Sequence, residues 1–242
     1  MFRTHMLTVV VLGVLGLLGA SWAGEEAKAG AKPIEPFNGK DLTGWKVKGP
    51  EAKSKWKVGT ASLDPANPAK LVCAEGGNEM VNLAPAHNTS LDIYCEPKCG
   101  DCVIDLEVMV AKGSNSGVYV MGEYEVQVLD SWGNKNPGPG DMGGIYGATA
   151  PKVNACKKPG EWQHYVIEWR APKFDAEGKK TANACFVKVT LNDQVIHENV
   201  EMKSQTPGGV AGKEAATGPI MFQGNHGPVA YRNIRITPVT EK

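Results

Sequence analysis

The sequence of 242 residues lacks a second long apolar run and an excess of basic residues. Apart from one N-terminal run, no apolar segment approaches the roughly 20 residues that a membrane-spanning helix needs. Lysine and arginine together number 26, aspartate and glutamate also number 26, and the two signs are intermixed. Proteins that bind nucleic acid usually carry a basic patch or stripe, so this balance argues against such a partner.

Helical periodicity is also missing: no segment repeats apolar residues with a helical spacing over ten or more positions. The chain instead has short alternating runs, separated by turns rich in glycine, proline and asparagine. In the clearest run, over 103–110, every second residue from Ile104 onward is Ile, Leu or Val. Many short strands of this kind predict an all-β fold, a β-sandwich or jelly roll.

Three common enzyme signals do not occur either. We find no Ser/His/Asp nucleophile phrase, no phosphate-binding glycine loop and no dinucleotide fingerprint. Any catalytic site must therefore be found from other clusters of ionisable residues.

The N-terminus has the pattern of a secretory signal peptide. Arg3 precedes an apolar run over 6–18, and the small-residue phrase Ser21-Trp22-Ala23 follows. We predict cleavage after Ala23. No cysteine stands directly after the apolar run, as a lipoprotein anchor would require, so the mature chain is predicted to be secreted or periplasmic and free of the membrane.

The mature chain is predicted to consist of a leader and one domain. Residues 24–34 are rich in Ala, Lys, Glu and Gly and predict a flexible leader. The remaining residues, 35–242, suit a single all-β domain of ordinary size. Removing 1–23 takes away one basic and no acidic residue, which leaves 25 basic against 26 acidic residues and a net charge near −1. The sequence does not indicate an oligomeric state.

Residues 115–131 predict a β-hairpin with polar side chains on one face. In its second strand, Tyr124, Val126 and Val128 alternate with Glu125 and Gln127. Residues two apart on a strand share a face, so Glu125 and Gln127 stand side by side. A carboxylate beside an amide can bind a polyhydroxylated ligand, although the same pair also suits a solvated outer face.

Six cysteines follow the predicted cleavage site, and an even number in an exported chain favours disulfides. They are Cys73, Cys95, Cys99, Cys102, Cys156 and Cys185. The spacing over 95–102 also suits a structural zinc site with Cys73 as fourth ligand. In both interpretations the cluster staples a loop. A redox motif at Cys99–Cys102 is the weakest interpretation, because no βαβ pattern surrounds it.

Six phrases, spread over nearly the whole mature chain, carry a family resemblance. They lie at 37–45 (Phe-Asn-Gly-Lys-Asp-Leu-Thr-Gly-Trp), 115–118 (Asn-Ser-Gly-Val), 124–131 (Tyr-Glu-Val-Gln-Val-Leu-Asp-Ser), 144–147 (Gly-Ile-Tyr-Gly), 160–163 (Gly-Glu-Trp-Gln) and 231–234 (Tyr-Arg-Asn-Ile). In this order they resemble the 3-keto-disaccharide hydrolase domain family. The chain departs from that family in its cysteine cluster and at Met121, where a basic residue is more usual.

The resemblance implies a concanavalin A-like jelly-roll sandwich and a carbohydrate substrate. It implies an exported hydrolase that cleaves 3-keto-glycosides or related glycosidic bonds. A ketone at C3 acidifies the hydrogen on C2, so the aglycone can leave by elimination, and hydration then completes the hydrolysis. The alternative is a non-catalytic carbohydrate-binding or adhesion module, because a fold alone does not decide function.

Most site residues are carried over from the phrases that match, and Gln223 and His226 are added from the stretch between the fifth and sixth phrases. We predict catalytic roles for Glu125, Asp130 and His226, with Glu125 as base or metal ligand and His226 as acid, base or ligand. A divalent metal cation is the one cofactor expected, with Glu125 and His226 as its ligands. The predicted substrate contacts are Gln127, Tyr146, Gln223, Arg232 and Asn115.

Each of these residues also has an ordinary structural interpretation. Asp130 can cap the loop that follows it by accepting backbone N–H groups. Arg232 can pair with a buried carboxylate, the commoner fate of an arginine in a strand. His226 can be an ordinary loop histidine, and Tyr146 can belong to the core and not to a sugar platform.

Overall fold

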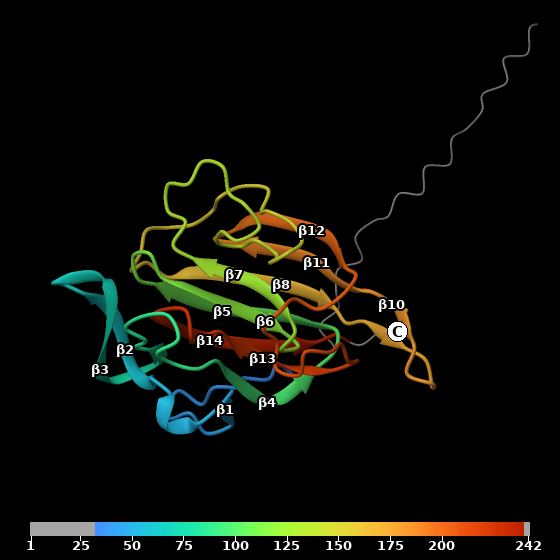
Figure 1. Cartoon of the computed structure of the whole chain (residues 1–242), viewed down its shortest axis with the longest axis horizontal. Helices are drawn as coiled ribbons and strands as arrows, with labels where there is room; N and C mark the ends of the chain where they lie inside the picture. Colours follow the sequence, from blue (N-terminus) through green and yellow to red (C-terminus); the bar gives the residue numbers. More distant parts are fainter. Residues whose placement is uncertain (1–31, 240–242) are drawn as a thin grey trace, which may run out of the picture.

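The computed structural model describes residues 32–239, and nearly all of the regular secondary structure in this range is β-strand (Figure 1). The helical structure in this range is a single 3-10 turn, Glu51–Lys53. No helix within 32–239 has the length and apolar character to cross a bilayer. The predicted signal peptide and its cleavage site lie outside the described residues.

The strands form two main antiparallel sheets. The five-stranded sheet has the order β1 (Trp45–Val47), β4 (Ile93–Cys99), β13 (Gly218–Phe222), β6 (Asn115–Val120), β7 (Tyr124–Leu129). The seven-stranded sheet has the order β12 (Gln194–Met202), β11 (Ala184–Leu191), β8 (Gln163–Arg170), β5 (Cys102–Val110), β14 (Val229–Pro238), β3 (Asn67–Asn82), β2 (Trp56–Asp64). A separate hairpin pairs β9 (Lys173–Phe174) with β10 (Lys180–Ala182).

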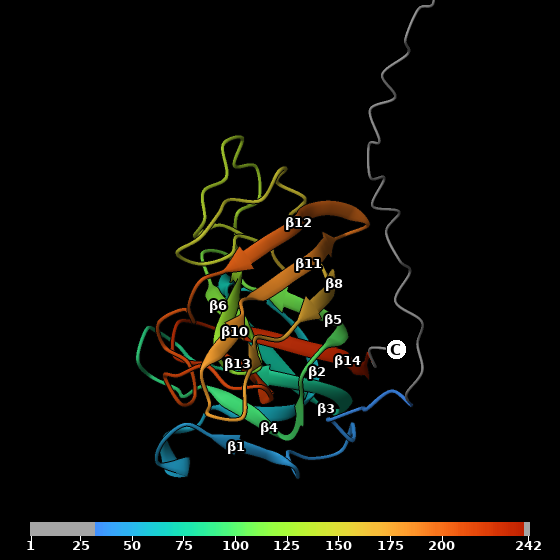
Figure 2. The same cartoon turned by 90° about the vertical axis from the view of Figure 1, so that its right-hand side faces the viewer.

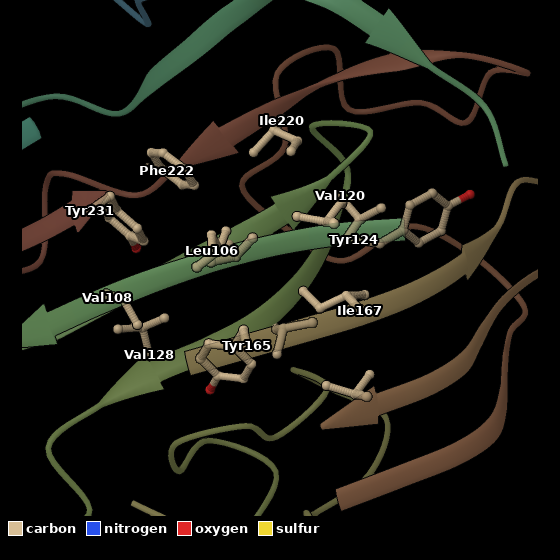
Figure 3. Close-up of a cluster of buried hydrophobic side chains, with 14 of the residues drawn as sticks. Leu106, Val108, Val120, Tyr124, Val128, Tyr165, Ile167, Ile220, Phe222 and Tyr231 are labelled. Carbon is tan, nitrogen blue, oxygen red and sulfur yellow. The ribbon is translucent and has the colours of Figure 1, made fainter. Parts of the chain in front are cut away.

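The core lies between the two sheets and contains side chains from both (Figure 3). The Phe222 and Tyr231 rings stack with their centroids 3.8 Å apart and join β13 of one sheet to β14 of the other. Leu106 and Val108 of β5 are fully buried beside them, as the alternation over 103–110 predicts. Burying one side chain of this size contributes roughly 1.5–3 kcal/mol. The predicted all-β jelly-roll sandwich is therefore confirmed.

The N-terminal boundary of the domain differs from the prediction. Ile34, placed in the flexible leader, forms an antiparallel bridge with Ile236 of β14. Two backbone hydrogen bonds of 2.7 and 2.8 Å join these residues. The leader prediction is wrong at this end, because strand pairing fixes the backbone from Ile34 onward.

Long connections leave the sheets where the site lies. The connection between β7 and β8, residues 130–162, rises beyond β12 at the top of Figures 1 and 2. It packs back on the sheet through backbone hydrogen bonds that join Gln127 to Gly143 and Gly144. Residues 203–217, between β12 and β13, reach the turn between β6 and β7. These two connections supply the walls described below.

Candidate active site

The hairpin of β6 and β7 presents one apolar and one polar face. Its turn contains Met121 and Gly122, both with positive φ (53° and 72°), so the chain reverses over three residues. The residues that face the core are Val118, Val120, Tyr124, Val126 and Val128. Strand alternation then places Glu125 and Gln127 on the opposite face. Glu125 pairs with Tyr119 across the ladder, and Gln127 pairs with Gly117.

A pocket of about 240 Å³ opens on this outer face of the five-stranded sheet. Its lining consists of Asn115, Tyr119, Glu125, Gln127, Tyr146, Pro207, Gly208, Gln223 and His226. Six of the eight predicted site residues are among them. A larger hollow of about 750 Å³ lies beside β1. The charged residues in its lining are Lys46 and Glu51, and both are exposed to solvent. We therefore place the candidate site in the smaller pocket.

Glu125 is only 2% exposed although its neighbours in the pocket are polar. Burial raises the pKa of its carboxyl to about 7; Asp92 adds to this rise, whereas a hydrogen bond with Tyr119 opposes it. Tyr119 has one hydroxyl proton and also donates it to the Pro207 carbonyl at 3.1 Å, so its hydrogen bond to Glu125 offsets only part of the effect of burial. A carboxyl that titrates near pH 7 suits proton transfer.

Gly117 makes room for this carboxyl. A Cβ atom at Gly117 would lie 2.2 Å from Oε1 of Glu125, closer than any real contact. The glycine in the Asn-Ser-Gly phrase therefore has a specific function, since any larger residue would displace Glu125.

His226 lies in the connection between β13 and β14 and is half-buried at the pocket. Its Nδ1 pairs with Oδ1 of Asn225, and because that oxygen only accepts, Nε2 is left with a free lone pair. Burial lowers the pKa of His226, the neighbouring His87 lowers it further, and Asp92 opposes both. The imidazole is therefore neutral at pH 7 and can accept a proton.

Two residues beside the site were not predicted. The His87 ring meets the His226 ring edge-on with centroids 4.4 Å apart. Asp92 is buried and accepts from the Gly224 backbone N–H at 3.0 Å, two residues before His226. His87 precedes the Asn88-Thr89-Ser90 turn, and Asp92 lies in a run of only four residues, 91–94, in which no second ionisable residue marks a site.

Amide groups complete the polar lining. Gln127 donates through Nε2 to the Gly140 carbonyl at 2.9 Å, which fixes its side chain. Oδ1 of Asn115 and Oε1 of Gln223 are buried and find no hydrogen-bond partner among the described residues. Buried polar atoms without a partner are costly, so these two oxygens are suited to bind ligand groups.

These oxygens also bear on the predicted cation. Within residues 32–239 no three His, Cys, Asp or Glu side chains converge as metal ligands. Glu125, His226 and the two amide oxygens form a mixed oxygen and nitrogen donor set that a hard divalent cation accepts. The residues present thus fit a cation, with the amides replacing further carboxylates.

Glu123 holds one wall of the pocket in place. Its buried carboxylate accepts from the backbone N–H groups of Ala211 at 2.6 Å and Gly212 at 3.0 Å. Thr206 bonds to the Glu123 carbonyl at 3.0 Å through its hydroxyl, which in turn accepts from the Glu125 N–H at 3.0 Å. Glu123 therefore fixes the connection that brings Pro207 to the pocket.

Replacing Glu123 with alanine should destabilise the fold and loosen this wall. The change leaves two backbone N–H groups without their carboxylate, and each such loss costs roughly 1–3 kcal/mol. We expect a lower urea midpoint and a raised KM for any substrate that the pocket turns over. Glu201→Ala, at an exposed position of β12, is the control. Equal midpoints for the two variants would contradict the role given to Glu123.

Two predicted site residues lie outside the pocket. Asp130 accepts from the backbone N–H of Gly113 at 2.8 Å and of Trp132 at 3.3 Å, so it caps the loops on either side. We therefore withdraw the catalytic role predicted for Asp130. Asp130 belongs to the same phrase as Glu125, but β7 ends at Leu129 and the chain turns away from the pocket before Asp130.

Arg232 is the second residue outside the pocket. Its guanidinium bonds to Glu107 at 2.6 Å and Glu79 at 3.2 Å and lies 4.0 Å from the Trp162 ring centroid. It is on β14 of the seven-stranded sheet, whereas the pocket lies on the other sheet. We withdraw the predicted sugar contact, and the carboxylate pairing foreseen for a strand arginine accounts for this residue.

Comparison with known proteins identifies the family. Residues 32–237 match the family described as the 3-keto-alpha-glucoside-1,2-lyase-like domain. A candidate glycosyl hydrolase from Parabacteroides distasonis ATCC 8503 has a similar crystal structure: 28% identity, TM-score 0.65, covering 86% of this chain and 84% of the other. A second candidate glycosyl hydrolase from that organism shares the fold at 18% identity and TM-score 0.58, covering 86% and 94%.

No curated protein matches the chain. The family match nevertheless spans nearly all of the described residues, and it agrees with the six phrases in the sequence and with the concanavalin A-like sandwich. A glycosidase-type or carbohydrate-binding role follows from it. The chain belongs to the 3-keto-alpha-glucoside-1,2-lyase-like domain family.

Proposed function

We propose that this protein cleaves 3-keto-glycosides by elimination between C2 and C1, followed by hydration. The observation that carries the proposal is the pairing of Glu125, with a pKa of about 7, and a neutral His226 in one pocket. Elimination needs one base and one acid near neutral pH, and this pair supplies both. The oxocarbenium route of most glycosidases instead uses two carboxylates.

Burial acts on the two residues in opposite senses. The sequence alone makes Glu125 the base, but burial raises the pKa of Glu125 to about 7 and so favours its protonated carboxyl, whereas burial lowers the pKa of His226 and so favours its neutral imidazole. We therefore assign His226 as the base and Glu125 as the acid. Nε2 of His226 takes the C2 hydrogen, the C–H electrons form the C1–C2 double bond, and the C1–O bond breaks. Glu125 gives its proton to the leaving oxygen.

Ring stereochemistry favours a site built from two separate elements. In an α-glucoside the C2 hydrogen and the C1 oxygen point to opposite faces of the ring, so the base and the acid approach from different sides. β7 supplies Glu125 and the β13–β14 connection supplies His226. Water then adds to C1 of the unsaturated product, and a proton returns to C2.

The ketone oxygen gains charge as the C2 hydrogen leaves. The amide oxygens of Asn115 and Gln223 line the pocket and can accept hydrogen bonds from the sugar hydroxyls beside that ketone. A divalent cation held by Glu125, His226 and these amides would occupy the lone pair and the carboxylate that proton transfer uses, so it would act in place of these acid and base roles and polarise the ketone as a Lewis acid. In that case a chelator should abolish turnover and added Mg²⁺ or Ca²⁺ should restore it.

Release of the aglycone from a 3-keto-glucoside tests the proposed function. We expect saturable release with the wild-type protein and none with the matching glucoside, whose C3 hydroxyl does not acidify C2. The competing function is a carbohydrate-binding module, supported by the exposed Tyr146 ring beside the pocket. Saturable binding of the 3-keto-glucoside without release would favour the module and overturn the enzyme.

Tyr146 is the aromatic candidate for contact with the aglycone. It lines the pocket yet is 43% exposed, and about 240 Å³ is small for more than one sugar ring. Tyr146→Ala should lower kcat/KM for a 3-keto-disaccharide about fivefold, the worth of roughly 1 kcal/mol of stacking. A methyl 3-keto-glucoside should be unaffected, and Tyr146→Phe should retain the wild-type rate. An equal loss on both substrates would contradict an aglycone contact.

We also propose that the protein works outside the cytoplasm, in the periplasm or the medium. The support is the sequence of residues 1–23, with its basic start, apolar run and small-residue phrase. N-terminal sequencing of the exported protein tests this: a mature chain that starts at Gly24 is the expected result.

A further inference from the structure

The cysteine cluster over 95–102 has no part in the proposed reaction, yet two of its members meet. Cys99 ends β4 and Cys102 begins β5, and their Sγ atoms are 3.4 Å apart. Their side chains belong to the core and are only 5% and 1% exposed. β4 lies in the five-stranded sheet and β5 in the seven-stranded sheet. This turn is therefore a direct covalent link between the two layers.

Contacts on the far side hold the turn in position. Oδ1 of Asp101 accepts from the Ala171 N–H at 2.8 Å, and Oδ2 pairs with Nζ of Lys173 at 3.0 Å. The turn is thus anchored to the end of β8 and the start of β9. A Cβ at Gly100 would lie 3.1 Å from the Ala216 carbonyl, so the turn also packs closely against the connection before β13. The two sulfurs face each other in a fixed frame.

The other cysteines are placed differently. In the part of the chain that the structure describes, Cys99 and Cys102 form the one contact between two sulfur atoms. Cys73 lies on β3 and Cys185 on β11, both in the seven-stranded sheet, and Cys156 lies between β7 and β8. Within 32–239 no three cysteines or other ligating side chains gather as a metal site. The zinc interpretation, which needs Cys73 beside 95–102, therefore loses its support.

We infer that Cys99 and Cys102 form an intramolecular disulfide that locks the link between the sheets. The two sulfurs lie 3.4 Å apart, and the bond brings them to about 2.0 Å. The oxidant is a disulfide compound: its S–S bond breaks and it leaves as two thiols, taking two electrons and two protons from the pair. The Cys102 thiol donates to Cys99, which lowers the pKa of Cys99 and makes it the attacking sulfur.

Peptide mapping tests the pairing directly, because trypsin separates the peptide that holds Cys99 and Cys102 from those that hold the other cysteines. The peptide 99–112 holds Cys99 and Cys102 together, and 71–98 holds Cys73 and Cys95. Cys156 and Cys185 fall in 153–157 and 181–188. The full chain is refolded in a glutathione redox buffer, alkylated in denaturant without reductant, and digested. We expect 99–112 to be unalkylated and two hydrogens lighter, with every other cysteine alkylated.

Alkylation of both cysteines in 99–112, or a link from this peptide to another, would overturn the inference. A stability measurement adds a second test. The double variant Cys99→Ser/Cys102→Ser should melt about 5 °C below the oxidised wild type, and reduction should remove most of this difference. Cys73→Ser, which keeps Cys99 and Cys102, is the control: its oxidised form should melt with the oxidised wild type, and reduction should lower both melting temperatures equally. An equal melting temperature of the wild type with and without reductant would also contradict the disulfide.

Discussion

Replacing Glu125 with glutamine should slow release of methanol from a methyl 3-keto-α-glucoside by about 10²–10⁴-fold, the usual contribution of a positioned acid. Release of nitrophenol from the corresponding aryl substrate should fall much less, because nitrophenolate leaves without a proton. Glutamine keeps the size of the side chain but cannot give up a proton. The measurement is kcat for both substrates, with Glu96→Gln on the protein surface as the control.

Stability separates this loss from unfolding. The pKa of Glu125 is about 7 when folded, against an ordinary value of 4.5, so the folded state binds the extra proton. The stability that the protonated carboxyl of Glu125 contributes to the fold is present at low pH and is lost as pH rises through 7. Glutamine carries no charge, so Glu125→Gln avoids the cost of burying an ionised carboxylate above pH 7. The variant should be more stable than wild type at pH 8, by on the order of 2–3 kcal/mol, and the two proteins should be equally stable near pH 4. A variant less stable than wild type at pH 8 would contradict the burial argument.

Replacing His226 with alanine should slow both substrates alike, by about 10²–10⁴-fold. The base acts on the C2 hydrogen, and that step is needed whatever the leaving group. Turnover of the nitrophenyl and methyl substrates gives the comparison. His164→Ala is the matched control, because His164 pairs with Asp105 on the seven-stranded sheet, away from the pocket.

The leaving-group pattern decides between the two assignments of roles. If His226→Ala spares the nitrophenyl substrate and Glu125→Gln does not, the acid is His226 and our assignment is wrong. The pH profile of wild-type kcat/KM alone cannot decide, since both assignments give a bell. Its acid limb should lie below the ordinary histidine pKa of 6.5 and its alkaline limb near 7. The alkaline limb should disappear in Glu125→Gln.

Much of the site could be predicted from the sequence because it sits on one short hairpin. Alternation around Glu125 and Gln127 requires no knowledge of distant contacts, and the turn at Gly122 fixes the register of the two strands. The family resemblance then connected this hairpin with Gln223 and His226, which alternation could not do. Strand order in the sheet explains the connection, since β13 lies beside β6.

Other parts of the site depend on long-range packing and carry no local signal. Asp92 and His87 flank a loop, and only the pairing of β4 with β13 brings that loop to Gly224 and His226. The direction of the chain after β7 was equally unpredictable. It carries Asp130 out of the pocket, although Asp130 follows Glu125 by only five positions.

Arg232 illustrates a different limit. It stands in a phrase shared with the family, and the resemblance therefore favours a sugar contact. Its actual role is set by the residues beside it on the neighbouring strands. Glu107 and Glu79 come from β5 and β3, which flank β14 on either side. Register between three strands cannot be read from the alternation of any one of them.

Cleavage of a 3-keto-glucoside in D₂O distinguishes elimination from direct displacement at C1, because elimination and hydration return a solvent proton to C2. We expect one deuterium at C2 of the 3-keto sugar in each early turnover. Preformed 3-keto sugar, incubated alone for the same time, controls for spontaneous exchange. Aglycone release that leaves C2 free of deuterium would contradict the account, since it would show that the C1–O bond breaks without loss of the C2 hydrogen.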